Sequence, residues 1–427
     1  MNLYYKLKSL DLSGVIIQSI IWLIFTSTSP FIFYKLIPYH PYKLLVFAGI
    51  LAAFFLFLKR KKIRIYDQSI LAILSVQIFA CFIFFSYQQF HLGADFKYIN
   101  LALQFITNLI LYLFITSFFN MKKLVQCNIY VISTMALLGA LVFFLLLTGF
   151  WKSFGSFKGP SWETQNFLFT TAGAVWKVED IFIIRVGGFF DEPGTFAFYI
   201  IFALITNQLL GFSRFCEKVL IFSGILTFSV TFFISIFFYF TIIYFKFKNL
   251  INIFLFLLFF IFFNNYIQNN KNNSRILNVI SIMTFDRMSV SEDSDKIIDG
   301  DTRIEPTKIA FSAFLKAPLM GHGLSVAERP NSEFYNQFLG ANIFTPLAYH
   351  GLIGAFCFYL LYFFWTIQCY KVYLRNFNKV VFAAWFIISI NLIQRPDAFI
   401  GSYGYFVFIF LITSTKNLNK KINEIVN

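Results

Sequence analysis

Hydrophobic residues in this chain form long runs that contain almost no charged residue, and several of the runs extend over 15 to 24 residues. An α-helix needs about 20 apolar residues to cross a hydrocarbon core roughly 30 Å thick. The pattern therefore predicts an all-α, polytopic integral membrane protein, with residues 1–427 forming a single membrane domain of about twelve transmembrane helices. The predicted spans are 14–34, 42–58, 68–86, 99–119, 127–150, 194–212, 217–229, 230–245, 249–263, 343–366, 380–394 and 403–415.

The stretch 217–245 is long for one span and short for two. Hydroxyl side chains can satisfy backbone groups at a break, so Thr227 and Ser229 favour a division there. With the break, one side of the membrane collects 19 of the 35 Lys and Arg residues, which marks it as cytoplasmic. Without it, eight of these basic residues, from Lys246 to Lys421, would move outside, against that rule. We therefore favour twelve spans with both termini in the cytoplasm.

Composition supports the membrane assignment. The chain is 58% hydrophobic and only 13% charged, which excludes an ordinary soluble enzyme. Its formal net charge of +15 would suggest a nucleic-acid partner in a soluble protein. In the predicted topology the 19 cytoplasmic Lys and Arg face four acidic residues, so the cytoplasmic side carries the whole excess. The charge is thus explained by orientation and by attraction to membrane lipids, without nucleic acid.

Two long segments, 151–193 and 264–342, are predicted as large loops on the outer, periplasmic face. Loops of this length in compact domains are usually functional or disordered. Within the second loop, the pattern from Pro306 to Leu315 predicts a short amphipathic helix. The five cysteines fall in spans or on the cytoplasmic side, and neither Cys nor His residues have the spacing of a metal site. We expect no cofactor and place any chemistry on the outer face.

The first candidate site runs from Arg185 into the sixth predicted span. Arg185 offers a fork of donors that suits phosphate, and Gly187 and Gly188 allow close approach of a ligand. Asp191 and Glu192 stand where a helix begins, and a shielded carboxylate there could act as a general base. The structural alternative is that the two carboxylates cap the helix and Arg185 snorkels at the membrane interface. The residues alone favour neither interpretation.

The second candidate site combines Arg303 with the turn Gly321-His322-Gly323, on either side of the predicted amphipathic helix. This turn would expose an imidazole and backbone amides that could hold an anion or transfer a proton. A lone Gly-x-Gly turn is nevertheless more often only a turn, and no nucleotide-binding loop accompanies it.

A third group of polar residues lies near the outer ends of the last spans. Asn342 and His350 flank the start of the span 343–366, where His350 has the alternative role of bonding a neighbouring helix. Gly351 and Gly354 are more typical of helix packing than of a site. Arg395 adds a cation in the last outer turn, unless it only pairs with a neighbouring carboxylate.

Taken in order, these motifs resemble the O-antigen polymerase (Wzy) family of bacterial envelope glycosyltransferases. Residues 185–194 are similar to its Arg-x-x-Gly-hydrophobic-x-Glu-Pro turn, and residues 303–323 to its Arg, short helix and Pro-Leu-x-Gly-x-Gly pattern. Residues 342–354 resemble its Asn-x-hydrophobic tract ending in Gly-hydrophobic-hydrophobic-Gly, and 227–229 its Thr-x-Ser break. The resemblance covers about residues 180–400.

The resemblance implies a polymerase of the bacterial inner membrane. It would transfer a growing glycan from undecaprenyl diphosphate to a new lipid-linked repeat unit at the periplasmic face, without metal or nucleotide. Its partners would be undecaprenyl diphosphate-linked glycans, membrane lipids and a chain-length regulator protein. The implied catalytic residues are Glu192 as first and His322 as second base candidate, with Arg185 and Arg303 clamping the diphosphate. The implied substrate-binding residues are Asp191, Gly187, Gly188, Gly321, Gly323, Asn342, His350 and Arg395.

Two alternatives remain. The related O-antigen ligases, and many polymerases, carry a His directly before the Asn of the third motif, whereas this chain has Ala341. This difference argues against a ligase and against a His-based mechanism taken from that branch. A repeat-unit flippase would place ionisable residues near the membrane midplane. Here the span interiors are almost free of charge, so the pattern favours the polymerase.

Overall fold

A computed structural model of the protein gives the arrangement of most predicted spans. It describes residues 48–53, 56, 63, 65–93, 95–147, 155–158, 163–167, 170–178, 181–188, 190, 193–244, 258, 261–263, 265–271, 274, 277, 281, 304–337, 339–340, 342–396 and 402–426. Several predicted features lie outside this part of the chain: the span 14–34, most of 42–58 and 249–263, and the residues Asp191, Glu192, Arg303 and Ala341.

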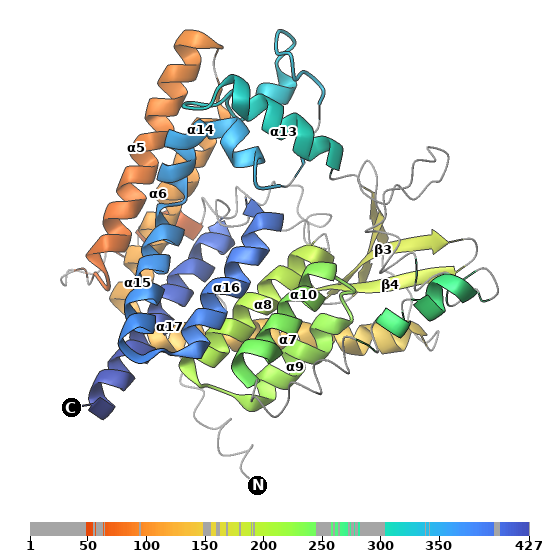
Figure 1. Ribbon diagram of the computed structural model, residues 1–427. Coiled ribbons are helices and arrows are strands. Elements are labelled where there is room, and N and C mark those ends of the chain that lie inside the picture. Colours follow the sequence, from red (N-terminus) through yellow and green to blue (C-terminus); the bar gives the residue numbers. More distant parts are fainter. Residues whose placement is uncertain are drawn as a thin grey trace.

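Four of the described helices are long and apolar enough to cross a membrane: α5 (Gln68–His91), α6 (Lys97–Phe118), α7 (Met121–Leu147) and α8 (Pro193–Leu210). A fifth span is possible if α14 (Thr345–Phe358) and α15 (Leu360–Asn376), which meet at an angle of 46°, are counted as one bent unit. These helices coincide with predicted spans and identify a membrane-associated helical protein. They pack with α16 (Lys379–Gln394) and α17 (Ser402–Val426) around a common apolar core (Figure 1).

Polar residues at the ends of the apolar runs fix where helices begin. The Asp67 carboxylate accepts a hydrogen bond from the Ser69 amide at 3.0 Å, and Asn378 caps α16 in the same way. Such caps satisfy amides that have no partner in the first turn of a helix. Among the spans, α8 is the central helix, since nearly all of its residues are buried.

The segment 217–245 is divided, as predicted, into two helices. α9 (Arg214–Ile225) ends in a turn, and α10 (Val230–Tyr239) begins after it and continues into the π-helical turn η1 (Phe240–Tyr244). The Glu217 carboxylate near the start of α9 accepts hydrogen bonds from the hydroxyls of Tyr239 and Tyr244. The two helices are therefore antiparallel, and the chain reverses at the break.

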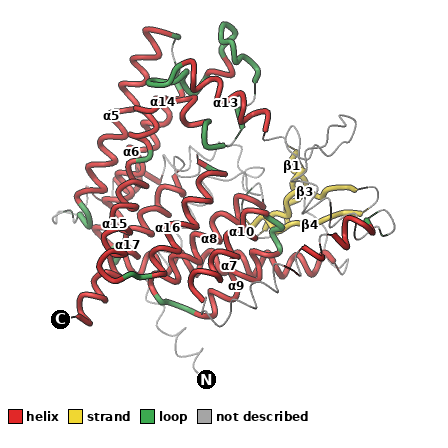
Figure 2. The backbone as a smooth tube through the Cα atoms, in the orientation of Figure 1, coloured by secondary structure: helices red, strands yellow, loops and turns green. Residues whose placement is uncertain are grey.

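The first segment that was predicted as an outer loop contains a four-stranded antiparallel sheet. Its strands follow one another in the order β1 (Gly155–Lys158), β2 (Glu163–Phe167), β3 (Thr170–Val178) and β4 (Ile181–Gly188). The missed signal was two apolar and β-branched runs separated by only two residues, so that Val178 pairs with Ile181. Figures 1 and 2 show the strands on one side of the helices, and β4 contacts α7 and α8.

The second outer segment carries the predicted amphipathic helix, which is α13 (Ile304–Lys316). Together with the residues up to 340 and the start of α14, it encloses a small apolar core of its own. This core is formed by Ala310, Ala313, Val326, Phe334, Leu339 and Ala348. Figure 1 shows α13 and α14 together at one end of α5, away from the sheet.

α14 is interrupted at Gly351, where φ is 63° and ψ is −172°. The carbonyls of Ala348 and Tyr349 accept hydrogen bonds from the amides of His322 and Gly323, both at 2.9 Å. On the other side of the break, the amides of residues 352 and 353 donate to the carbonyls of residues 318 and 319. The turn 317–323 thus satisfies the backbone groups that the interruption frees.

Replacing Gly351 tests this close fit. A Cβ atom there would lie 2.3 Å from the Leu319 backbone, and the backbone conformation favours glycine. We expect Gly351→Ala to lower the free energy of unfolding by about 1–2 kcal/mol for the conformation and by about 1–3 kcal/mol more for the overlap. Gly211→Ala is the matched control, because Gly211 has φ of 58° with nothing within 4 Å of an added Cβ. Equal losses in thermal unfolding of the detergent-solubilised variants would contradict the proposed fit.

Candidate functional site

Arg185 lies on β4 and connects the sheet to the helix break. Its Nε donates to the Thr227 carbonyl at 3.0 Å, and one terminal nitrogen donates to the Phe228 carbonyl at 3.1 Å. The neighbouring Val186 amide donates to the Leu226 carbonyl at 3.1 Å. The residue is buried, so the expected alternative of snorkelling at the membrane interface does not describe it. The carbonyls of Leu226, Thr227 and Phe228 have no helical partner because α9 ends before them. The first of these carbonyls holds the backbone of β4, and the other two orient the guanidinium group of Arg185.

Arg395 follows α16 and reaches the first turn of α8. Its Nη1 donates to the Thr195 hydroxyl at 2.8 Å, and Nη2 lies 2.9 Å from where a Cβ on Gly194 would stand. The guanidinium group therefore touches the positive end of the α8 dipole rather than lying apart in an outer turn. Asp397, its predicted alternative partner, lies outside the described residues. The Arg395 guanidinium group thus lies against Gly194 and Thr195, which follow Asp191 and Glu192 closely in the sequence.

Of the two glycines of the first motif, Gly188 serves packing and Gly187 takes part in a turn. Gly188 has φ of 61°, and the ring of Phe196 lies 2.8 Å from where its Cβ would be. The Gly187 carbonyl accepts a hydrogen bond from the Phe190 amide at 3.0 Å. The space beside Gly188 is therefore filled by a ring of α8 and not left for a ligand. Through this contact β4, which carries Arg185, meets the same first turn of α8 that Arg395 reaches.

The amides of the turn Gly321-His322-Gly323 already have partners within the protein. They donate to the carbonyls of Ala317, Ala348 and Tyr349 at 2.9 to 3.0 Å. The expectation that these amides could hold an anion is therefore wrong, because two of the three hydrogens serve the break in α14 and the Gly321 hydrogen is bonded to the Ala317 carbonyl. Only the imidazole of this turn remains for chemistry.

The His322 imidazole is half-buried and bonded to α13. Its Nε2 lies 2.9 Å from the Ala313 carbonyl, which can only accept, so Nε2 carries the proton. Burial lowers the pKa of His322 below its ordinary value, and the hydrogen bond to Ala313 opposes this shift only in part. The ring is therefore neutral at pH 7, with Nδ1 as the basic nitrogen.

Asn342 and His350 hold the start of α14 in place. The Asn342 side chain accepts from the Phe344 amide at 3.0 Å and donates to the Leu339 carbonyl at 2.7 Å, which is a local cap. His350 is buried, and its Nδ1 lies 2.9 Å from the Tyr98 hydroxyl on α6. The alternative that His350 bonds a neighbouring helix is therefore confirmed.

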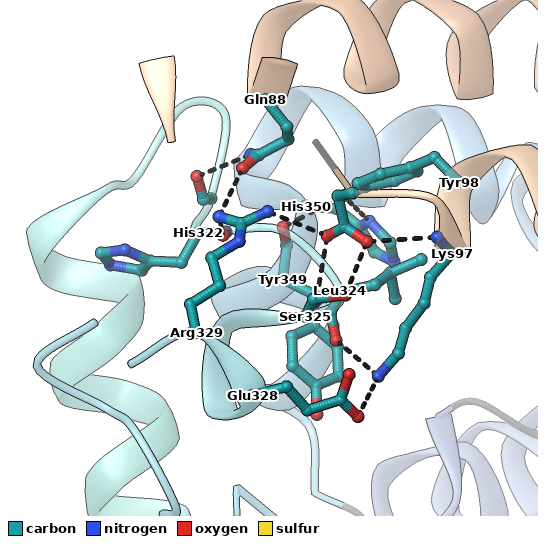
Figure 3. Close-up of polar contacts among 12 residues, drawn as sticks. Gln88, Lys97, Tyr98, His322, Leu324, Ser325, Glu328, Arg329, Tyr349 and His350 are labelled. Carbon is teal, nitrogen blue, oxygen red and sulfur yellow. Dashed lines mark hydrogen bonds and ion pairs between the residues drawn. The ribbon is translucent and has the colours of Figure 1, made fainter. Parts of the chain in front are cut away.

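The structure also reveals a polar cluster that the sequence analysis did not identify. We call it the Asp95 cluster, and Figure 3 shows its side chains converging from α5, the start of α6 and the segment after His322. The Asp95 carboxylate is fully buried and accepts from the Ser325 amide at 2.9 Å and from the Ser325 hydroxyl at 2.8 Å. Its ion pair with Arg329 measures 3.2 Å. The members are Gln88, Asp95, Lys97, Ser325, Glu328 and Arg329.

Arg329 is the centre of this cluster. One terminal nitrogen donates to the Gln88 side-chain oxygen and to the His322 carbonyl, both at 3.1 Å, while the other pairs with Asp95. Lys97 forms a more exposed ion pair with Glu328 at 2.6 Å. Because these partners come from distant parts of the chain, no local motif marks them. The only indication of the cluster in the sequence was the carboxylate of Asp95, in the short turn between α5 and α6.

The predicted site residues fall into two groups. The first group consists of Gly188 and Arg395, which contact the first turn of α8, and of Arg185 and Gly187 on the neighbouring end of β4. The second consists of Gly321, His322, Gly323, Asn342 and His350, which belong to α14 or to the segments before it. Figure 1 shows these two regions apart. Within the described residues, no group of three or more His, Cys, Asp or Glu side chains could hold a metal ion.

In comparisons with known proteins, the chain matches no protein-family model and no curated protein sequence.

Removing Arg329 should destabilise the protein strongly. Arg329→Ala leaves the Asp95 carboxylate buried without its cation, which typically costs about 3–5 kcal/mol. Glu328→Gln, which breaks only the exposed pair with Lys97, should cost less than about 1 kcal/mol. Unfolding in detergent by chemical denaturant measures both. Similar midpoints for the two variants would show that the buried pair does not hold the outer segment.

His322 should make stability depend on pH in one direction. Because the pKa of its imidazole is lowered in the folded state, the unfolded chain binds a proton first as pH falls below about 6.5. Stability should therefore be constant above that pH and decline below it until the folded-state pKa is reached. His322→Gln keeps a side-chain N–H donor but does not titrate, so it should flatten this part of the profile. Thermal unfolding between pH 5 and pH 8, compared with the parent protein, measures the difference, and identical slopes would contradict it.

Proposed function

We propose that the protein is a polysaccharide polymerase of the O-antigen polymerase type, acting at the periplasmic face of the bacterial inner membrane with both termini in the cytoplasm. The observation that carries the proposal is that the Arg395 guanidinium reaches the first turn of α8, against which the end of β4, the strand that carries Arg185, also packs through Gly188. This turn directly follows Asp191 and Glu192 in the sequence. The arrangement fits a lipid-linked diphosphate better than it fits a neutral sugar alone.

The leaving group of such a reaction is a diphosphate, and it is the part of the substrate that gains charge. Guanidinium groups match phosphate oxygens in a bidentate way, and the start of a helix adds amide donors and a favourable dipole. Arg185 is held by two carbonyls and is therefore oriented before a substrate arrives. Preorganised donors of this kind stabilise charge that develops in a transition state. Arg303 remains part of the proposed clamp.

In the proposed reaction, the hydroxyl oxygen of the acceptor repeat unit attacks C1 of the donor sugar. The new bond joins this oxygen to C1, the bond between C1 and the diphosphate oxygen breaks, and undecaprenyl diphosphate leaves with the electron pair. The hydroxyl proton passes to the Glu192 carboxylate, which directly precedes the first residue of α8. His322 is the weaker base candidate, because its region lies apart from the start of α8. No nucleotide or metal enters this scheme.

Deletion of the gene distinguishes the three candidate functions in the native host. Surface glycan that carries a single repeat unit supports a polymerase. Full-length polymer that stays on its lipid carrier would indicate a ligase, and repeat units trapped at the cytoplasmic face would indicate a flippase. Either of these last two outcomes would overturn the proposal. A chain-length regulator is a proposed partner of the same system.

Variants at the start of α8 should separate activity from folding. Glu192→Gln should reduce polymer formation by about 10²–10⁴-fold, which is the usual contribution of a general base. Arg395→Ala and Arg185→Lys should also shorten the glycan ladder, since a lysine cannot provide the fork of donors. Arg375→Ala, in an exposed position near the end of α15, is the matched control.

Glycan ladders from complemented deletion strains, together with immunoblots of the membrane fraction, provide the measurement. Normal ladders from Glu192→Gln and Arg395→Ala at normal protein levels would exclude this site.

A further inference from the structure

Helix α13 exposes large apolar side chains that a helix on a water-soluble domain would normally bury. Its inward face carries Ala310 and Ala313, which are fully buried, and Ile309 packs against the same core. Its outward face carries Phe311 and Leu315, which are 42% and 59% exposed. A surface helix in water normally turns its large apolar side chains inward. The outward face of α13 is therefore suited to an apolar environment.

The apolar surface continues from α13 onto α14. Leu319, which is 60% exposed, follows α13, and its carbonyl accepts a hydrogen bond from the Ile353 amide at 3.2 Å. This bond places Leu319 next to the exposed side chains on α14. We call the continuous surface the apolar strip, and it consists of Phe311, Leu315, Leu319, Leu352, Ile353 and Phe356.

The strip leads into a surface that faces lipid. Below the bend, α15 continues the broken span and exposes Phe363 and Ile367. The hydrogen bond between Arg329 and Gln88 joins the outer segment to the last turns of α5. Phe90, in the same turns, is also exposed, and α5 is apolar enough to cross a membrane. An exposed Phe side chain at the end of an apolar helix is suited to contact with acyl chains near the membrane boundary. The outer segment containing α13 is therefore level with the membrane boundary.

Charge on the same helix agrees with this position. Lys308 is exposed and lies one turn before Phe311, on the same side of α13. At the other end, Lys316 is exposed and paired with Glu333. Lysines at the edge of an apolar face can extend their charged ends to lipid phosphates while their stems lie along the hydrocarbon.

We propose that α13 is an interfacial helix that lies on the outer leaflet of the membrane, with the apolar strip in contact with lipid acyl chains and Lys308 at the phosphate level. The occupant of the strip is bilayer lipid. The proposal follows from exposure, continuity with the broken span and charge. It does not depend on the polymerase reaction.

Spin labels on the full-length protein in phospholipid vesicles test the proposal. Leu315→Cys and Leu319→Cys are labelled in turn, and the parent chain, whose five cysteines are buried or half-buried, is the labelling blank. Collision with oxygen, which concentrates in lipid, and with a nickel chelate, which stays in water, gives two accessibilities for each label. Ile367→Cys on α15 is the lipid-facing control, and Asn331→Cys in an exposed polar turn is the water-facing control.

We expect labels at both α13 positions to match Ile367→Cys, with high oxygen and low nickel accessibility and an oxygen-to-nickel ratio several-fold above that of Asn331→Cys. A ratio equal to that of Asn331→Cys would place α13 in water and overturn the proposal. Low accessibility to both reagents would also overturn it, because a second copy or another protein would then cover the strip. Unchanged size-exclusion profiles of the labelled proteins confirm folding, and the two positions provide independent readings.

Discussion

Backbone groups inside a bilayer must find partners within the protein, because hydrocarbon offers none. Continuous helices meet this requirement alone, but the chain breaks between α9 and α10, and α14 is interrupted at Gly351, and each break releases carbonyls or amides. At the first break, Arg185 and Val186 supply donors to three carbonyls. At the second, the turn 317–323 supplies both donors and acceptors. The positions of the two outer segments follow from these two interruptions.

This constraint ties the two segments that were predicted as outer loops to the helical bundle. The sheet reaches the start of α8 because Arg185 and Val186 bind the break that follows α9, and Gly188 packs against Phe196. The second outer segment is held by the Asp95 cluster as well as by α14. A guanidinium group that closes a helix break cannot move freely. The same contacts that support the fold therefore give the proposed site its rigidity.

The sequence predicted those parts of the fold that depend on local patterns. Charge-free runs identified α5 to α8, the hydroxyl pair at Thr227 and Ser229 predicted the break, and amphipathic spacing predicted α13. The sheet was missed because hydropathy averaged over a long window hides short strands, whose stability comes from pairing such as Val178 with Ile181. Most spans can be recognised from their own residues, whereas the strands can be recognised only together with the strands they pair with.

The site was predicted less well, because its contacts join distant residues. Arg185 was identified from its motif, but the Thr227 carbonyl that orients it is 42 positions away. Arg329 was missed altogether, since nothing near it in the sequence indicates a buried carboxylate 234 positions earlier. The amide role proposed for the turn at His322 was wrong for the same reason, because the α14 carbonyls that occupy the amides of His322 and Gly323 lie beyond the motif.

The order in which the interrupted helices and their partners occur along the chain bears on how the protein is made. Arg185 precedes the break at Thr227, and the turn 317–323 precedes the interruption at Gly351. Because synthesis proceeds from the N-terminus, each partner has already left the ribosome when the broken helix follows. Asp95 likewise precedes Arg329. The hydrogen-bonding groups that pair with the backbone at each break are therefore made before the break itself. This order limits the time that unpaired amides and carbonyls of a broken helix spend in lipid.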